Sequence, residues 1–143
     1  MEFYSQSRWA GPRYEEVRKK SLTTTEIAKL IRKDIKKKYP KLKTSLKTQY
    51  FAGGSAIDVR IKDFGFNPIN PSYNLDDWRS EDYRNPMYTP RALKIMEGIK
   101  NIGNKYRYED IDPMTDYHAT SFFWDVDVDY EYRDKFINRL KKR

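Results

Sequence analysis

The residues best suited to acid–base chemistry lie in the stretch DPMTDYH, which ends at His118, the only histidine of the sequence. Asp112, Asp116 and Tyr117 stand close before it, and a carboxylate beside a histidine is a common way to hold a general base. This spacing is therefore the first place to look for catalysis.

Catalysis by His118 would also require a nucleophile, and Ser55 and Ser121 are the nearest candidates. Neither lies in a pattern that resembles a nucleophile elbow. We favour the alternative, a polar connector that docks on a sheet through Asp116 and Tyr117, and we expect no catalytic residue and no enzymatic activity.

Three aspartates alternate along the stretch SFFWDVDVDYEY at Asp125, Asp127 and Asp129. Carboxylates suit hard cations such as Ca²⁺ and Mg²⁺, but side chains at alternate strand positions fan out and cannot all reach one ion. We therefore expect these aspartates to pair with Arg60 and Lys62 across a sheet, or to face a basic partner. No metal site and no cofactor are expected.

The stretch YFAGGSAIDVRI contains a Gly-Gly-Ser step that could turn a hairpin or cradle a phosphate. A phosphate loop needs Gly-Lys-Ser/Thr opening a helix, whereas Ser55 leads into alternating strand residues. Gly53 and Gly54 are predicted to take the positive-φ positions of a tight turn, which directs Ile57, Val59 and Ile61 to the core.

Positive charge is concentrated in one segment of the chain. The net charge is +8, yet residues 11–48 carry 13 Lys and Arg against 4 Asp and Glu, while residues 49–143 carry 15 against 16. Such a local excess indicates a patch that faces an acidic partner.

The predicted patch combines a helix face with the strand after it, and a lysine-rich surface of this kind can lie along a phosphate backbone. The alternative is a solvated surface that keeps the protein soluble. Tyr50 and Phe51 could stack on unpaired bases, or fill the rim of the core. The predicted contact residues for nucleic acid or a protein partner are Lys29, Arg32, Lys33, Lys36, Lys37, Lys41, Lys43, Lys47 and Tyr50.

Residues 65–88 carry three Asn-Pro steps without periodicity, which predicts a long surface loop. Trp78, Arg79, Tyr83 and Arg84 give it the aromatic and arginine content of protein-binding hot spots. The alternative is a loop that these aromatics strap across its own core.

Two helices should position the basic patch. The first begins at Thr23, with Glu26 completing a capping box, and ends before Pro40. The second is capped by Thr89 and ended by Gly103. Each carries an apolar stripe at helical spacing, made of Ile27, Leu30, Ile31 and Ile35 in the first and of Ala92, Ile95, Met96, Ile99 and Ile102 in the second.

These elements predict an α+β domain over residues 22–143, with residues 1–21 as an N-terminal extension. A small antiparallel sheet of about three strands would be covered on one face by the two main helices, and a short helix would close the chain. Residues 65–88 would be an insertion.

The sequence contains no cysteine, so a disulfide or a cysteine-ligated zinc site is excluded. No apolar run is long enough to cross a membrane, and the first residues lack the apolar core of a secretory signal. We expect a protein of the host cell cytoplasm without membrane contact.

The stretches TTTEIAKLIRKDIKKKYP, YFAGGSAIDVRI and DPMTDYHATSFFWDVDV, in this order, resemble the large polyvalent protein-associated domain numbered twenty-nine, over about Leu22 to Asp129. The resemblance implies a domain of phages and conjugative elements, whose long proteins act against host defences or on nucleic acid; it implies no defined activity.

Two hypotheses follow. The first is a small non-enzymatic phage or mobile-element protein that binds DNA, RNA or a host nucleic-acid-handling complex through the lysine-rich helix. The second is a protein–protein inhibitor of a host defence system, of the anti-restriction or anti-CRISPR type.

Overall fold

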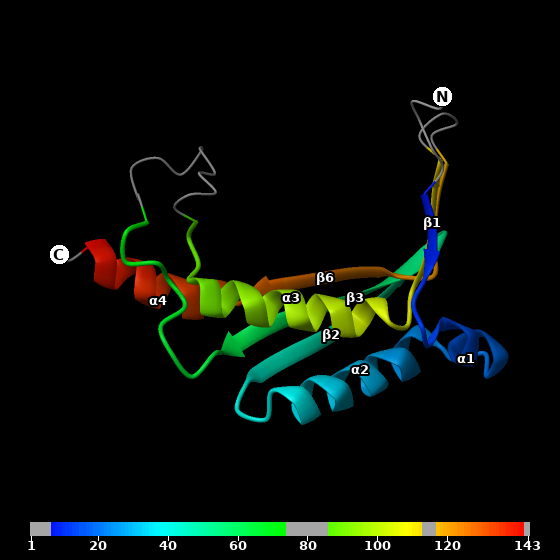
Figure 1. Ribbon diagram of the computed structural model, residues 1–143, viewed down its shortest axis with the longest axis horizontal. Coiled ribbons are helices and arrows are strands. Elements are labelled where there is room, and N and C mark those ends of the chain that lie inside the picture. Colours follow the sequence, from blue (N-terminus) through cyan, green and yellow to red (C-terminus); the bar gives the residue numbers. More distant parts are fainter. Residues whose placement is uncertain (1–6, 74–85, 113–116, 142–143) are drawn as a thin grey trace.

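The computed structural model describes residues 7–73, 86–112 and 117–141, which form two three-stranded sheets and four helices (Figure 1). The predicted α+β class and the short C-terminal helix are confirmed. In chain order the elements are β1 (Ser7–Ala10), α1 (Tyr14–Lys19), α2 (Thr24–Lys38), β2 (Lys43–Phe51), β3 (Gly54–Asp63), α3 (Pro90–Asn104), β4 (Tyr108–Asp112), β5 (Tyr117–Thr120), β6 (Phe123–Val128) and α4 (Tyr130–Lys141).

The central sheet has the order β2-β3-β6, and β2 and β3 form the predicted hairpin. Phe51 pairs with Gly54, so the turn itself is Ala52-Gly53, and Gly53 alone takes the positive φ, at 91°. Gly54 was also expected there; instead it opens β3, where an added Cβ would lie 3.3 Å from the Phe51 ring.

The third strand differs from the expected antiparallel arrangement, because β6 pairs in parallel with β3. The chain leaves β3 at its far end, returns through α3, and begins β6 beside the start of β3, with Phe123 opposite Ala56 (Figure 1). Parallel neighbours require a crossover of this kind, usually through a helix.

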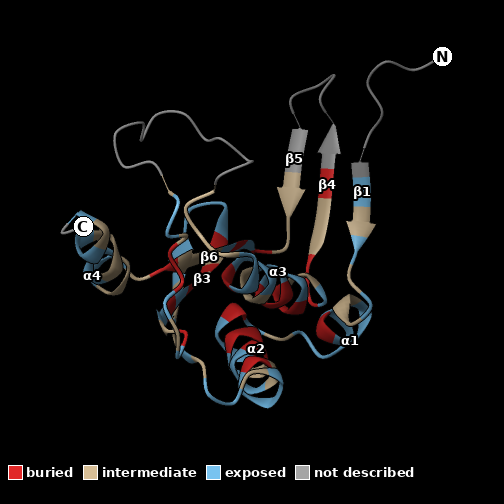
Figure 2. Cartoon of the chain, turned by 60° about the vertical axis from the view of Figure 1, so that its left-hand side comes forward, coloured by how far each residue is buried: buried red, intermediate tan, exposed pale blue. Residues whose placement is uncertain are grey.

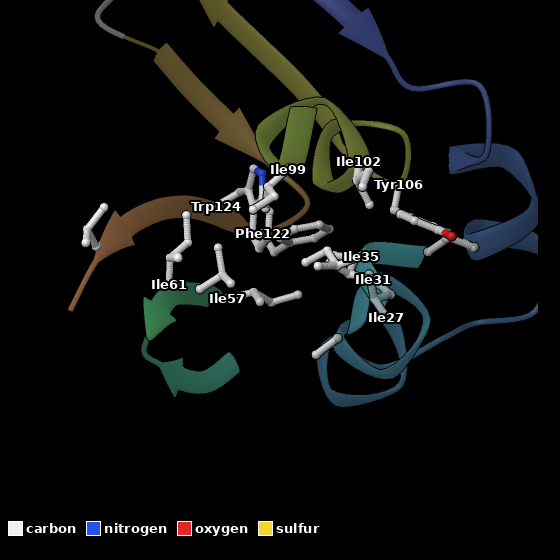
Figure 3. Close-up of a cluster of buried hydrophobic side chains, with 14 of the residues drawn as sticks. Ile27, Ile31, Ile35, Ile57, Ile61, Ile99, Ile102, Tyr106, Phe122 and Trp124 are labelled. Carbon is white, nitrogen blue, oxygen red and sulfur yellow. The ribbon is translucent and has the colours of Figure 1, made fainter. Parts of the chain in front are cut away.

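The core lies between the central sheet and the two long helices, as predicted (Figures 2 and 3). Ile31 of α2, Ile99 of α3 and Ile57 of β3 are all fully buried. The capping box that starts α2 is present, with Thr23 and Glu26 bonded reciprocally, and Thr89 caps α3. By contrast, α4 contains no buried residue.

Gly103 does not end α3, which continues to Asn104. This glycine is buried against Trp124, and a Cβ at this position would lie 2.1 Å from Cε2 of the indole. It allows the helix to pack closely on β6, so its role is close approach rather than helix termination.

A second sheet, of order β1-β4-β5, was not expected from the sequence. Its strands are four or five residues long, and it projects from the rest of the molecule in Figure 2. β1 comes from the predicted N-terminal extension, and the chain then docks on the end of α3, where the Gly11 amide donates to the Arg107 carbonyl at 2.8 Å.

Candidate nucleic-acid interface

The helix α2 directs its cations outward because its other side is held in the core. Ile27, Ile31 and Ile35 are 0–4% exposed and fix the rotation of the helix about its axis. All the cations predicted on the opposite side are exposed, and we call them the α2 basic face: Lys29, Arg32, Lys33, Lys36 and Lys37.

Nothing among the described residues neutralises the α2 basic face. None of its five cations has an ion-pair or hydrogen-bond partner there, and Glu26, the acid at the start of α2, is engaged in the capping box. Several cations elsewhere do have carboxylate partners, namely Arg8, Arg13, Arg18, Lys20, Lys62 and Arg133.

The lysines that follow α2 do not all join this face. Lys41 lies in the turn after the helix and Lys43 at a register shift where β2 begins. Lys47 points to the side of the sheet away from α2, because its neighbours Leu46 and Thr48 pair with the buried positions of β3. The continuous patch predicted from the sequence is therefore divided between two faces.

Tyr50 connects the hairpin to the first turn of α2. Its hydroxyl accepts from the Thr25 amide at 3.0 Å and lies 2.9 Å from the Thr25 hydroxyl, and these bonds lower the pKa of Tyr50. The ring is still 62% exposed, at the edge of the α2 side. Tyr50 is thus both a structural contact and an accessible aromatic surface.

Phe51 points the other way and lies beside Phe123 of β6, with ring centroids 6.0 Å apart. The two rings are 47% and 44% exposed, on the face of the sheet that α2 and α3 leave uncovered. In the strand register, Lys47 lies opposite Asp58, and Asp58 lies opposite Asp125. This face of the sheet therefore carries charges of both signs.

The serines considered as nucleophiles both make structural hydrogen bonds. The Ser55 hydroxyl is buried and lies 2.6 Å from the Thr24 hydroxyl, which joins β3 to α2. The Ser121 hydroxyl accepts from the Tyr108 amide at 2.9 Å. His118 lies on β5 opposite Ile111, in a different sheet from Ser55.

Of the three alternating aspartates, Asp129, which directly follows β6, takes the pairing role predicted for them. Lys62 donates to Asp129 at 2.9 Å, and this hydrogen bond lowers the pKa of Asp129. Asp127 lies opposite Arg60 in the register, and its carboxylate accepts from the Val128 amide. Across the described ranges no group of three or more acidic or histidine side chains could hold a metal ion.

The predicted loop residues Trp78, Arg79, Tyr83 and Arg84 lie outside the described residues, which stop at 73 and resume at 86. The base of the loop is closed: the Asn70 amide donates to the Met87 carbonyl at 2.7 Å and the Thr89 amide to the Pro68 carbonyl at 2.9 Å. Pro68 and Ile69 are buried there.

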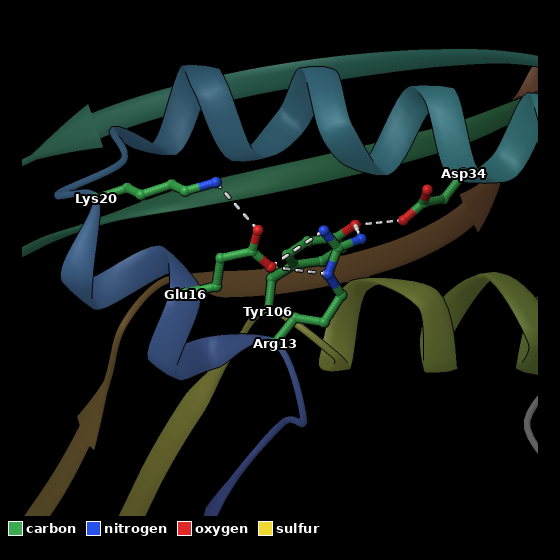
Figure 4. A network of polar contacts seen from close by, with 5 residues as sticks. All are labelled: Arg13, Glu16, Lys20, Asp34 and Tyr106. Carbon is green, nitrogen blue, oxygen red and sulfur yellow. Dashed lines mark hydrogen bonds and ion pairs between the residues drawn. The ribbon is translucent and has the colours of Figure 1, made fainter.

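A polar network beside α2 was not predicted from the sequence (Figure 4). The Tyr106 hydroxyl donates to Asp34 and accepts from Arg13 at 2.9 Å, while Arg13 and Lys20 both bind Glu16. Burial, and then the hydrogen bond to Asp34, raise the pKa of Tyr106. Asp34, the one acid between the lysines of α2, was the only sequence signal for this network.

These features define a small α+β domain with a basic helix face that has no carboxylate partner in the described part of the chain. A family model, large polyvalent protein associated domain 29, matches residues 22–139, and the chain belongs to this family of domains from the polyvalent proteins of phages and other mobile elements. Searches of curated proteins and of solved structures find no match. Within the described ranges, every helix is too short or too polar to cross a bilayer.

Proposed function

We propose that this chain is a non-enzymatic phage or mobile-element protein that binds nucleic acid through the α2 basic face. The observation that supports this is the set of five exposed cations without a partner among the described residues. Six cations elsewhere in the described chain have carboxylate partners, whereas none of these five has one, so the charge on α2 is available to an external anion.

Nucleic acid fits this face in shape and spacing. Residues 29–37 extend about 12 Å along the helix, at roughly 1.5 Å per residue. A duplex presents one phosphate charge for about every 1.7 Å of its axis, so four or five cations can each neutralise a phosphate. The face is mostly lysine, which acts as a point charge, so the binding should be independent of base sequence.

A charge-reversal variant tests the proposal. In the triple variant Lys29→Glu, Lys33→Glu and Lys36→Glu, each replacement removes an attraction and adds a repulsion. We expect its affinity for a labelled duplex, measured by fluorescence anisotropy at about 50 mM salt, to fall by more than about 100-fold.

The matched control carries the same change of net charge on exposed residues elsewhere: Lys94→Glu, Lys100→Glu and Lys141→Glu. It should bind within a few fold of the unaltered chain. Equal loss in both variants would assign the binding to net charge alone. If the unaltered chain binds neither duplex nor single strands, the proposal is refuted.

A second candidate is the inhibitor of a host defence system, which would bind a protein. The uncovered side of the central sheet favours it, because Phe51 and Phe123 are exposed there among charges of both signs. Aromatic side chains within a polar rim are typical of protein interfaces.

A pull-down from host lysate, with and without nuclease, separates the two candidates. A bound protein that survives nuclease and is lost with Phe51→Ala and Phe123→Ala would support the inhibitor. A partner that nuclease removes, and that the α2 reversal abolishes, would support nucleic-acid binding instead.

A further inference from the structure

A cleft of about 430 Å³ lies where the end of α2, the end of α3 and the start of α1 meet. It is separate from the outer surface of α2, and shares only Lys37 with the α2 basic face. The residues that line it are Arg13, Asp34, Lys37, Lys38, Ile102 and Lys105.

The backbone holds this cleft in shape. The Arg13 amide donates to the Lys105 carbonyl at 2.9 Å, which places the two side chains at the same corner. Gly11 permits that approach, because a Cβ there would lie 2.1 Å from the Asn104 carbonyl oxygen. A larger residue at position 11 would push the two apart.

Arg13 is positioned by side chains as well (Figure 4). Its guanidinium donates to the Tyr106 hydroxyl at 2.9 Å and binds Glu16 at 3.2 Å, and it lies over the Tyr106 ring. These contacts use part of its five N–H donors, so donors remain for a ligand. The cation is thus fixed before any ligand arrives.

The net charge of the cleft is positive. Four cations line it against one carboxylate, and Asp34 already accepts the Tyr106 hydroxyl. Tyr106 stays protonated near neutral pH because burial raises its pKa, so it adds no negative charge. Glu16, which is bound to Arg13, and two helix ends, which contribute roughly half a negative charge each, reduce the excess to about one positive charge.

The lysines of the cleft are available. Lys37 and Lys105 have no ion-pair or hydrogen-bond partner among the described residues, and Lys38 contacts only the ring of Tyr39, 5.5 Å away. Cations from three elements that line a single cleft suit one compact anion better than a phosphate track spread along a surface.

We propose that this cleft binds a phosphate monoester, the dianionic group found on a mononucleotide and at the 5′ end of a nucleic-acid strand. The phosphate oxygens contact Arg13, Lys37, Lys38 and Lys105. Ile102, the one apolar residue of the lining, is only 3% exposed, so the attached nucleoside lies largely in solvent. The volume lies in the range of small-ligand sites, roughly 300–1,000 Å³. The site stands whether or not the α2 basic face binds a duplex.

Calorimetric titration of the full chain tests the site, with adenosine monophosphate, adenosine and inorganic phosphate as probes. We expect the monophosphate to bind at least about tenfold more tightly than adenosine, because only the phosphate meets the cations. Lys38→Gln with Lys105→Gln should weaken this binding by about tenfold or more.

The control Lys94→Gln with Lys100→Gln changes the same number of charges on α3 and should leave monophosphate binding intact. The reversal at Lys29, Lys33 and Lys36 should leave it intact too, which separates this site from the proposed function. The proposal is overturned if neither phosphate probe binds, or if adenosine binds as tightly as the monophosphate. It is also overturned if Lys38→Gln with Lys105→Gln leaves monophosphate binding unchanged.

A second titration separates the two sources of the phosphate, a strand end and a mononucleotide. It compares the binding of two short single strands of the same sequence, one with a 5′-phosphate and one with a 5′-hydroxyl. Tighter binding of the phosphorylated strand, lost in the cleft variant, supports the site and assigns it to strand ends. Equal binding of the two strands, together with cleft-dependent binding of the monophosphate, supports it as a mononucleotide site.

Discussion

Gly11 and Gly103 mark two places where the backbone comes too close to a neighbour for a side chain. Gly11 meets the carbonyls at the end of α3, and Gly103 meets the indole of Trp124. The sequence pattern places Gly11 in an N-terminal extension and predicts a helix end at Gly103. Local patterns gave no sign of either contact, because each is made with a residue at least 20 positions away.

Replacing Gly103 by alanine should destabilise the fold. Alanine would gain up to about 1 kcal/mol in helix propensity, but overpacking a core costs roughly 1–3 kcal/mol. Trp124 cannot retreat easily, since its Nε1 donates to the Lys100 carbonyl at 3.0 Å. We expect a net loss of about 1–2 kcal/mol in urea unfolding.

The matched change is Gly98→Ala on the same helix, where the new Cβ would meet the hydroxyl end of Tyr39, a side chain that can swing aside. Its loss should be clearly smaller. Equal stability of Gly103→Ala and the unaltered chain would contradict the close packing of α3 on β6.

Tyr106→Phe removes the hydroxyl that joins Arg13 to Asp34. Tyr106 is only 1% exposed, but Arg13 and Asp34 line the open cleft, where water can replace the hydroxyl, so we expect a loss of about 0.5–1.5 kcal/mol in unfolding free energy. Tyr130→Phe, at a ring that is 49% exposed, should change it by less than about 0.5 kcal/mol. Indistinguishable losses would show that the network does not stabilise the fold.

At the scale of elements, the sequence predicted the long, well-marked pieces. The capping box at Thr23, the cap at Thr89 and the alternation around Ile57 are local signals, and each is present. The strands β1, β4 and β5 are too short for a period, and the parallel pairing of β6 depends on the crossover through α3. Those features depend on distant partners, which local patterns do not specify.

The ion pair between Lys62 and Asp129, at the connection from the central sheet to α4, predicts how stability depends on pH. Lys62 lowers the pKa of Asp129 below its ordinary 3.8, so the stabilisation is fully present above that value and is lost as the pH falls through the lower pKa of the folded state. Asp129→Asn should therefore be less stable than the unaltered chain near neutral pH. The difference should shrink at about pH 2, as measured by chemical unfolding.

Lys62→Met provides the complementary variant, because it removes the cation and keeps the carboxylate. The stability of this variant should depend less on pH in the acid range than that of the unaltered chain. A stability gap for Asp129→Asn that is the same at both pH values would rule out a contribution from the ion pair.

For the whole molecule, positive charge lies in the segment of the chain that the sequence count indicated. The positions of these cations in space differ in part from the prediction. The basic helix face was predicted residue by residue, while Lys47 proves to lie on the other side of the sheet, since strand register decides which way it points. Nothing in the sequence predicts the cleft, because Arg13 and Lys105 are far apart in the chain and are brought together by the Arg13 amide bond to the Lys105 carbonyl and the close approach at Gly11. The family match covers residues 22–139, so Arg13 lies outside the matched range.

The measurement that tests the central claim most directly is the salt dependence of duplex binding. If four or five cations of the α2 basic face neutralise phosphates, the logarithm of the affinity should fall against the logarithm of salt concentration with a slope of about −3.6 to −4.5. The affinity would then drop roughly 150- to 500-fold between about 50 and 200 mM salt. A slope between 0 and about −1 in the unaltered chain, or the same slope after reversal of Lys29, Lys33 and Lys36, would contradict the account.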